Sequence, residues 1–164
     1  MRSLSALFLL FPGLAHADPE PSLWEAELRV GYGVAVTGGT EMSSTSTTPL
    51  GLAAIGALAV REEPRIYAFG GVTAETLERN AVGVIAGVRI QPFDGAIRLA
   101  AGGTWMVAPA TLWGAVGSAG VCHRGTLGLC VDAQLTTYVA GTGLAPDETI
   151  TQLQLVGALV FDAL

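Results

Sequence analysis

Six charged side chains occupy positions from which they could meet and pair: Glu25, Glu27, Arg29, Arg89, Arg98 and Asp132. Each lies in a segment of alternating residue types, on the face that also carries small or polar residues. Three arginines can neutralise three carboxylates, and buried charges are tolerated when they are paired and hydrogen-bonded. We therefore expect a neutral charge network inside the fold, with a proton or ion path as the alternative.

Two cysteines, Cys122 and Cys130, flank the short segment HRGTLGL. Both fall on the polar face of their segments. Side chains directly opposite one another on paired strands are close enough for a disulfide, and an oxidising compartment favours that bond. The sequence predicts a Cys122–Cys130 disulfide; two free buried thiols are the alternative.

The sequence contains few residues suited to catalysis or metal binding. His123 is the only histidine after residue 17, and it has no obvious serine partner on a neighbouring turn. Hydrolytic triads need a nucleophile, a histidine and a carboxylate together. One histidine and two cysteines do not make a recognised metal-ligand set. The sequence therefore predicts no enzyme activity, no metal and no cofactor.

The elements that would position these residues are clearest between residues 81 and 107. In 81–91 and in 97–107 one parity is almost wholly apolar, while the other mixes glycine with arginine and glutamine. A period of two indicates strands, and Pro92 with Asp94-Gly95 forms a turn between them. Each run is about ten residues, the length with which a tilted strand crosses a bilayer. The apolar face would then meet lipid, and the polar face would line a lumen.

The same pattern extends along the chain. Strands are expected at 23–36, 50–60, 65–73, 81–91, 97–107, 111–122, 127–139 and 150–164. The facing of 50–60 and 65–73 is undecided. Polar loops are expected at 38–49, 74–80 and 140–149, with one helical turn as the alternative in 74–80. Short turns at 61–64, 92–95 and 123–126 lie on the opposite side, and 108–110 is a short link.

Without a helix long enough for a crossover, consecutive strands must be antiparallel. In lipid the sheet must also close, because an open edge would leave backbone groups unpaired in hydrocarbon. The sequence therefore predicts an all-β fold, an up-and-down antiparallel transmembrane β-barrel of about eight strands.

Composition and the N-terminal segment agree with a membrane location. The chain is 51% hydrophobic and 13% charged, against roughly 25% charged in a typical soluble domain. Residues 1–17 resemble a signal peptide, with Arg2, an apolar core and the cleavage site Ala15-His16-Ala17. Residues 18–164 would then form the barrel domain. The formal net charge of -6 argues against nucleic-acid binding, which needs a positive surface.

Aromatic residues fall near both ends of the expected strands. Aromatic girdles of this kind mark the two interfaces of membrane-spanning barrels. The expected girdle residues are Trp24, Tyr67, Phe93 and Phe161 at one end and Trp105 and Trp113 at the other.

By this pattern, over nearly all of the mature chain, the sequence resembles the small eight-stranded outer-membrane barrels of the OmpA/OmpX type. The resemblance implies insertion into the outer membrane of a Gram-negative bacterium, with outer-membrane lipid and the barrel insertion machinery as partners. Such proteins commonly end in an aromatic residue, whereas this chain ends Phe161-Asp162-Ala163-Leu164. A soluble periplasmic barrel is therefore kept as an alternative.

The expected function is a structural or surface-interaction role, with the lumen plugged by the charge network. The main alternative is a carrier or narrow channel for a small apolar ligand. It would use the part of the lumen between the charge network and the longer loops, where the inward residues are mostly small. A lipid-modifying enzyme is the third interpretation, and it would depend on His123.

Overall fold

The structure, a computed structural model, describes residues 23–39, 43–76, 80–123 and 127–163. These residues form nine strands and one 3-10 helix: β1 (Trp24–Gly38), β2 (Ser43–Thr47), β3 (Leu50–Arg61), β4 (Arg65–Thr76), β5 (Ala81–Gln91), η1 (Phe93–Gly95), β6 (Ile97–Ala108), β7 (Leu112–His123), β8 (Gly128–Gly141) and β9 (Thr149–Ala163). No helix in this part of the chain is long and apolar enough to cross a membrane. The predicted signal peptide, residues 1–17, lies outside the described residues.

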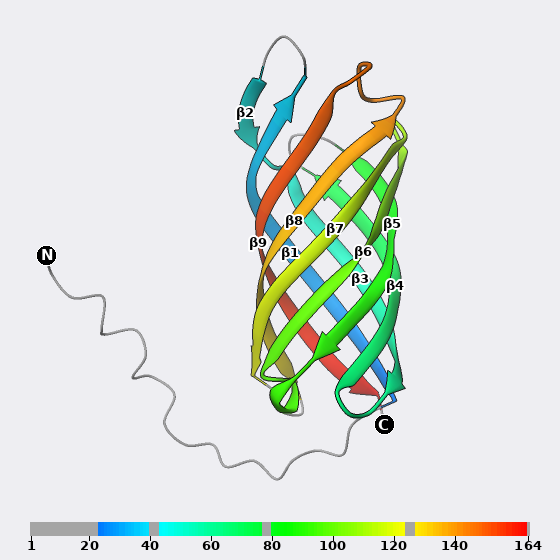
Figure 1. The fold of residues 1–164 in the computed structure, drawn as a ribbon, viewed down its shortest axis with the longest axis vertical. Coiled ribbons are helices and arrows are strands. Elements are labelled where there is room, and N and C mark those ends of the chain that lie inside the picture. The colour runs from blue at the N-terminus through cyan, green and yellow to red at the C-terminus, as the bar shows by residue number, and fades with distance from the viewer. Residues whose placement is uncertain (1–22, 40–42, 77–79, 124–126, 164) are drawn as a thin grey trace, which may run out of the picture.

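Eight of these strands close into a barrel. β1 and β3 to β9 pair with their neighbours in chain order, all antiparallel, and β9 pairs back onto β1 along its whole length. Figure 1 shows a tall cylinder of tilted strands. We call the end where β1 begins and β9 finishes the terminal end, and the opposite end the loop end. The predicted all-β, up-and-down transmembrane barrel of about eight strands is confirmed.

The pairing register fixes how residues from different strands reach the same level of the lumen. Following directly paired residues once around the barrel from Glu27 returns to β1 at Thr37, ten residues further along. A stagger of this kind tilts the strands by about 35–45° and leaves an interior that side chains can fill. Residues far apart in the sequence therefore meet inside the barrel.

One predicted loop is wrong in part. Within 38–49 the run Ser43–Thr47 forms β2, which pairs with the outer part of β1 from Val34 to Gly38. β3 takes over the same edge of β1 from Gly31 downwards, so the hairpin extends the sheet beyond the rim (Figure 1). Polar serine and threonine suggested a loop, but threonine is also a good strand former, and pairing satisfies the backbone of β1. Similarly, β4 runs to Thr76, which shortens the predicted connection at 74–80.

The outer face of the barrel is apolar and exposed. Along β1 the residues Leu28, Val30 and Val34 are 53%, 47% and 47% exposed, while the alternate residues are mostly buried. β1 advances ten residues from Trp24 to Val34, which at a rise of ~3.3 Å and a tilt of ~45° spans roughly 23 Å. That height is close to the ~25 Å apolar band of a membrane-spanning barrel.

The facing of β3 and β4, undecided from sequence, is settled by pairing. Directly paired residues on neighbouring strands share a face, and Tyr67 on β4 is paired with the inward Arg89 on β5. Tyr67, Phe69 and Glu75 therefore point into the lumen, as Ile55 and Ala57 do on β3.

Candidate functional site

The charge network fills the lumen near the terminal end. It consists of Glu25, Glu27, Arg29, Arg89, Arg98 and Asp132, each no more than 8% exposed. β1 supplies three of these residues because every second side chain of its first half faces inwards. The stagger of the barrel brings the other three from β5, β6 and β8 to the same level. The structure thus brings together all six residues that the sequence singled out.

Glu27 is the hub of the network. Its carboxylate accepts from Nε of Arg29 at 2.6 Å and from Nη1 of Arg89 at 2.6 Å. Nη1 of Arg98 lies 2.8 Å from its Oε1. Three guanidinium groups thus surround one buried carboxylate, and charge-assisted contacts of this type are stronger than neutral hydrogen bonds.

The remaining carboxylates complete the neutralisation. Arg89 also donates through Nη2 to Glu25. Arg98 forms a two-pronged pair with Asp132, with Nε donating to Oδ1 at 2.6 Å and Nη2 donating to Oδ2. The planar fork of arginine matches a carboxylate in this geometry. Three positive and three negative groups are consequently linked in one connected network that crosses the lumen from β1 to β6 and reaches β8.

The assignment of Tyr67 to an aromatic girdle is wrong. Tyr67 is 0% exposed, and the Arg89 guanidinium lies 5.1 Å from the centre of its ring. The phenol therefore packs on the charge network from inside the barrel, in a cation–π contact. Aromatic residues near strand ends suggested an interface position, but the parity of β4 directs this ring inwards.

The lumen above the network contains an apolar layer. Ile55, Phe69, Ile85 and Val116 are buried together with Ala57 and Tyr67.

Close to the terminal end, Cys122 and Cys130 are directly paired on β7 and β8 and are joined by a disulfide. This disulfide packs against Ala158 and Val160 of β9.

The lumen nearer the loop end contains both polar residues and an apolar cluster of Ala81, Met106, Leu112 and Tyr138. Two adjoining cavities there are lined by apolar residues, among them Leu52, Ile85 and Val116, and by polar ones. The polar lining residues include Thr73, Glu75, Thr104, Gln134, Thr136, Gln152 and Gln154. We call them together the upper-lumen chamber. The sequence pattern misses Glu75 because it predicts a polar connection at 74–80. Extending the parity of Tyr67 and Phe69 by six residues would have placed Glu75 inside.

The remaining predicted residues lie outside the lumen. His123 is exposed at the end of β7. Among the described residues, no group of three or more His, Cys, Asp or Glu side chains is placed to hold a metal ion.

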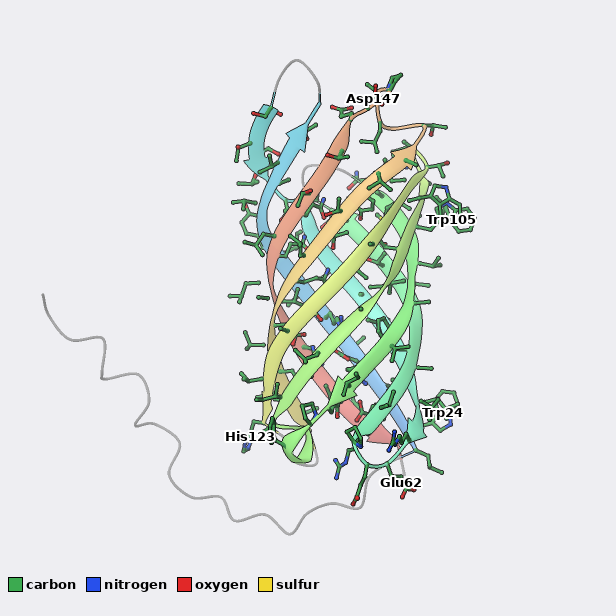
Figure 2. The ribbon with its side chains drawn as sticks, in the orientation of Figure 1. Trp24, Glu62, Trp105, His123 and Asp147 are labelled. Atoms are coloured by element: carbon green, nitrogen blue, oxygen red, sulfur yellow. A yellow bond between two sulfur atoms is a disulfide. The ribbon has the colours of Figure 1, made fainter. Side chains whose placement is uncertain are left out.

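Five of the predicted girdle residues are exposed on the outside. Trp24, Phe93 and Phe161, at 56%, 75% and 41%, lie at the terminal end. Trp105 and Trp113, at 37% and 49%, lie near the loop end, where their rings stack with centroids 4.5 Å apart. Figure 2 shows Trp24 and Trp105 projecting from the barrel towards its two ends, with Glu62 and Asp147 in the connections beyond them.

A closed eight-stranded barrel with an apolar exterior and charged and polar residues in its lumen defines a small transmembrane β-barrel. The resemblance to small outer-membrane barrels is thereby confirmed at the level of the fold.

Of the comparisons with known proteins, the one with solved structures supports this fold. No protein-family model matches the chain, and no curated protein matches it. The crystal structure of Ail, the attachment invasion locus protein of Yersinia pestis, in complex with the heparin analogue sucrose octasulfate, has a TM-score of 0.51 and 12% identity over 84% of this chain and 99% of Ail. A second crystal structure of Ail has a TM-score of 0.51 and 11% identity over 84% and 98% of the two chains.

A weaker match is Neisserial surface protein A (NspA), with a TM-score of 0.48 and 6% identity over 87% of this chain and 98% of NspA. A TM-score of 0.48 supports no conclusion about this chain. At the identity found with Ail, the likeness concerns the fold alone.

Proposed function

We propose that this chain is an integral outer-membrane protein with a structural or surface-interaction role, and that its lumen does not conduct. The observation that carries the proposal is the filled cross-section of the barrel. Glu27, with three arginines around it, spans the lumen together with Asp132 and Glu25, and an apolar layer lies directly above. A hydrated path would have to break both layers.

The loop end is the surface that such a protein offers to partners. The described residues at this end that lie outside the eight barrel strands (39, 43–49 with β2, 80, 109–111 and 142–148) include Asp147 and Glu148 and no basic side chain. Ail was crystallised with a heparin analogue, which is a polyanion. The described part of this loop surface does not supply the positive charge that a polyanion needs, so we propose that its partner is uncharged or cationic.

The other interpretations fit the structure less well. A carrier for an apolar ligand would need an apolar pocket, whereas the upper-lumen chamber mixes apolar residues with amides, hydroxyls and Glu75. A soluble periplasmic barrel would expose an extensive apolar belt to water. An enzyme would need a nucleophile and a base in contact inside a site, whereas His123 is exposed at the end of β7.

Fractionation of cells that express the full chain tests the location. We expect the protein in the outer-membrane fraction, extracted only by detergent, with a gel mobility that shifts on heating because the barrel resists unfolding in detergent. N-terminal sequencing should begin at Asp18, as the predicted signal peptide requires. Recovery as a soluble periplasmic monomer would refute the membrane proposal.

A further inference from the structure

The upper-lumen chamber carries chemistry that a plug does not need. Its two cavities share the lining residues Gly51, Thr73, Ile85, Gln134 and Gln154, so they adjoin. Their volumes are about 50 and 40 Å³, counted as the space open to the centres of water-sized molecules. The charge network and the apolar layer lie between the chamber and the terminal end, so a solute would have to arrive from the loop end.

Two glutamines in the chamber have unused hydrogen-bonding groups. Gln152 is 3% exposed and Gln154 is 7% exposed. Neither side-chain amide is hydrogen-bonded to another described residue. Both glutamines line the chamber, so water or another polar molecule inside it can hydrogen-bond to their amides. The Gln154 amide adjoins Gly31 and Gly51, whose missing side chains leave room beside it.

We propose that the upper-lumen chamber binds a small uncharged polyol. Glutamine amides both donate and accept. The hydroxyls of Thr73 and Thr104 donate to the carbonyl oxygens of Leu52 and Val84 and can still accept, whereas the Thr136 hydroxyl accepts from Gln134 and can still donate. Such a lining suits the hydroxyl groups of a polyol. Arg29, at the floor, is already paired with Glu27 and is not available for an anion.

The size of the chamber sets the size of the ligand. A water molecule needs about 10–15 Å³ of such space, so the two cavities together hold roughly six water-sized groups. Glycerol has about that many non-hydrogen atoms. The proposal extends the proposed function without depending on it, because a chamber that is blind at its lower end binds a solute without conducting.

Binding is tested by titrating the folded protein in detergent micelles with glycerol and following the ¹⁵N side-chain amide signals of Gln134, Gln152 and Gln154. We expect saturable shifts of these signals in the wild type. A parallel titration with xenon, an apolar probe, should leave them unchanged. Absence of a saturable glycerol shift means that water alone fills the chamber, and it would overturn the proposal, as would saturation by xenon instead of glycerol.

Matched glycine variants on β3 locate the site. A Cβ added at Gly51 would lie 3.7 Å from the Gln154 Nε2, an ordinary contact inside the chamber, so Gly51→Leu should fill it and abolish the glycerol shift. Gly56 lies on the opposite face, where an added Cβ would lie 3.9 Å from Cζ3 of Trp24, and Gly56→Leu should bind like the wild type. Equal binding by both variants would refute the assignment.

A third variant protects the test against misfolding. Gln154→Leu keeps the side-chain volume close to that of glutamine and removes one amide. It should weaken glycerol binding about tenfold or more, the loss of roughly one good hydrogen bond, read at Gln134 and Gln152. Unchanged affinity in this variant would contradict the proposed role of the amide.

Discussion

Arg98→Ala is the perturbation that probes the charge network most sharply. Arg98 is the sole hydrogen-bonding partner of the Asp132 side chain among the described residues, and Asp132 is 1% exposed. Removing the guanidinium therefore leaves a buried carboxylate with no countercharge. Glu27, in contrast, keeps Arg29 and Arg89, each 2.6 Å away.

The expected loss in the free energy of unfolding follows from this difference between Asp132 and Glu27. Breaking a buried pair by removing one partner costs about 3–5 kcal/mol. Adding Asp132→Ala to Arg98→Ala leaves two carboxylates facing two arginines, which restores neutrality, so we expect a coupling energy of about 2–3 kcal/mol. Adding Glu27→Ala instead removes the hub while Asp132 stays unpaired, so a smaller part of the loss should return.

The assay is reversible urea unfolding in lipid vesicles, followed by tryptophan fluorescence, for the wild type, the single variants and both double variants. Arg61→Ala is the control, because Arg61 is exposed at the end of β3 and its loss should change the free energy of unfolding by less than about 0.5 kcal/mol.

A solvated lumen would give different numbers. Arg98→Ala would then cost under about 1 kcal/mol, as for an exposed pair, and its effect would add to that of Asp132→Ala within about 0.5 kcal/mol. That combination would refute the reasoning that the network is a buried, mutually dependent unit.

Three further predictions address the barrel around the network. Gly120→Ala should destabilise the barrel by about 1–3 kcal/mol, because an added Cβ would lie 1.9 Å from the Asp132 Oδ1 and 2.3 Å from the Val131 carbonyl oxygen. Gly117→Ala on the same strand, whose nearest contact would be 3.8 Å, should be close to neutral in the same assay. The two cysteines should resist alkylation without reductant, as read by mass spectrometry, and replacing both with serine should cost roughly 2–3 kcal/mol in the chain-entropy model; full labelling of both would contradict the disulfide. Lipids brominated near the headgroup should quench the three tryptophans more strongly than lipids brominated near the chain ends, as interfacial girdles require; the reverse order would contradict that position.

The sequence predicted the architecture wherever the two faces of a strand differ clearly in chemistry. In β1, glutamate and arginine alternate with leucine and valine, and β5, β6 and β8 show the same contrast. There a period of two reveals both the strand and its facing. The inward set of charges followed from that parity, because a charge on the lipid-facing side would be costly.

The sequence was insufficient where that contrast is absent. β3 has small or aliphatic residues on both faces, so its facing depends on pairing with β1 and β4, a long-range property. Tyr67 was misplaced for the same reason. β2 was missed because its serines and threonines are equally at home in a loop, and its strand conformation depends on the free edge of β1. The particular contacts, such as Arg98 with Asp132, depend on the ten-residue stagger, which no local pattern contains.

Planar-bilayer recording of the purified wild-type barrel tests the central claim most directly. A lumen crossed by the charge network and the apolar layer predicts no steady conductance above that of the bare bilayer. Steady, ohmic conductance from the folded, heat-modifiable protein would contradict the plug and identify the barrel as a channel.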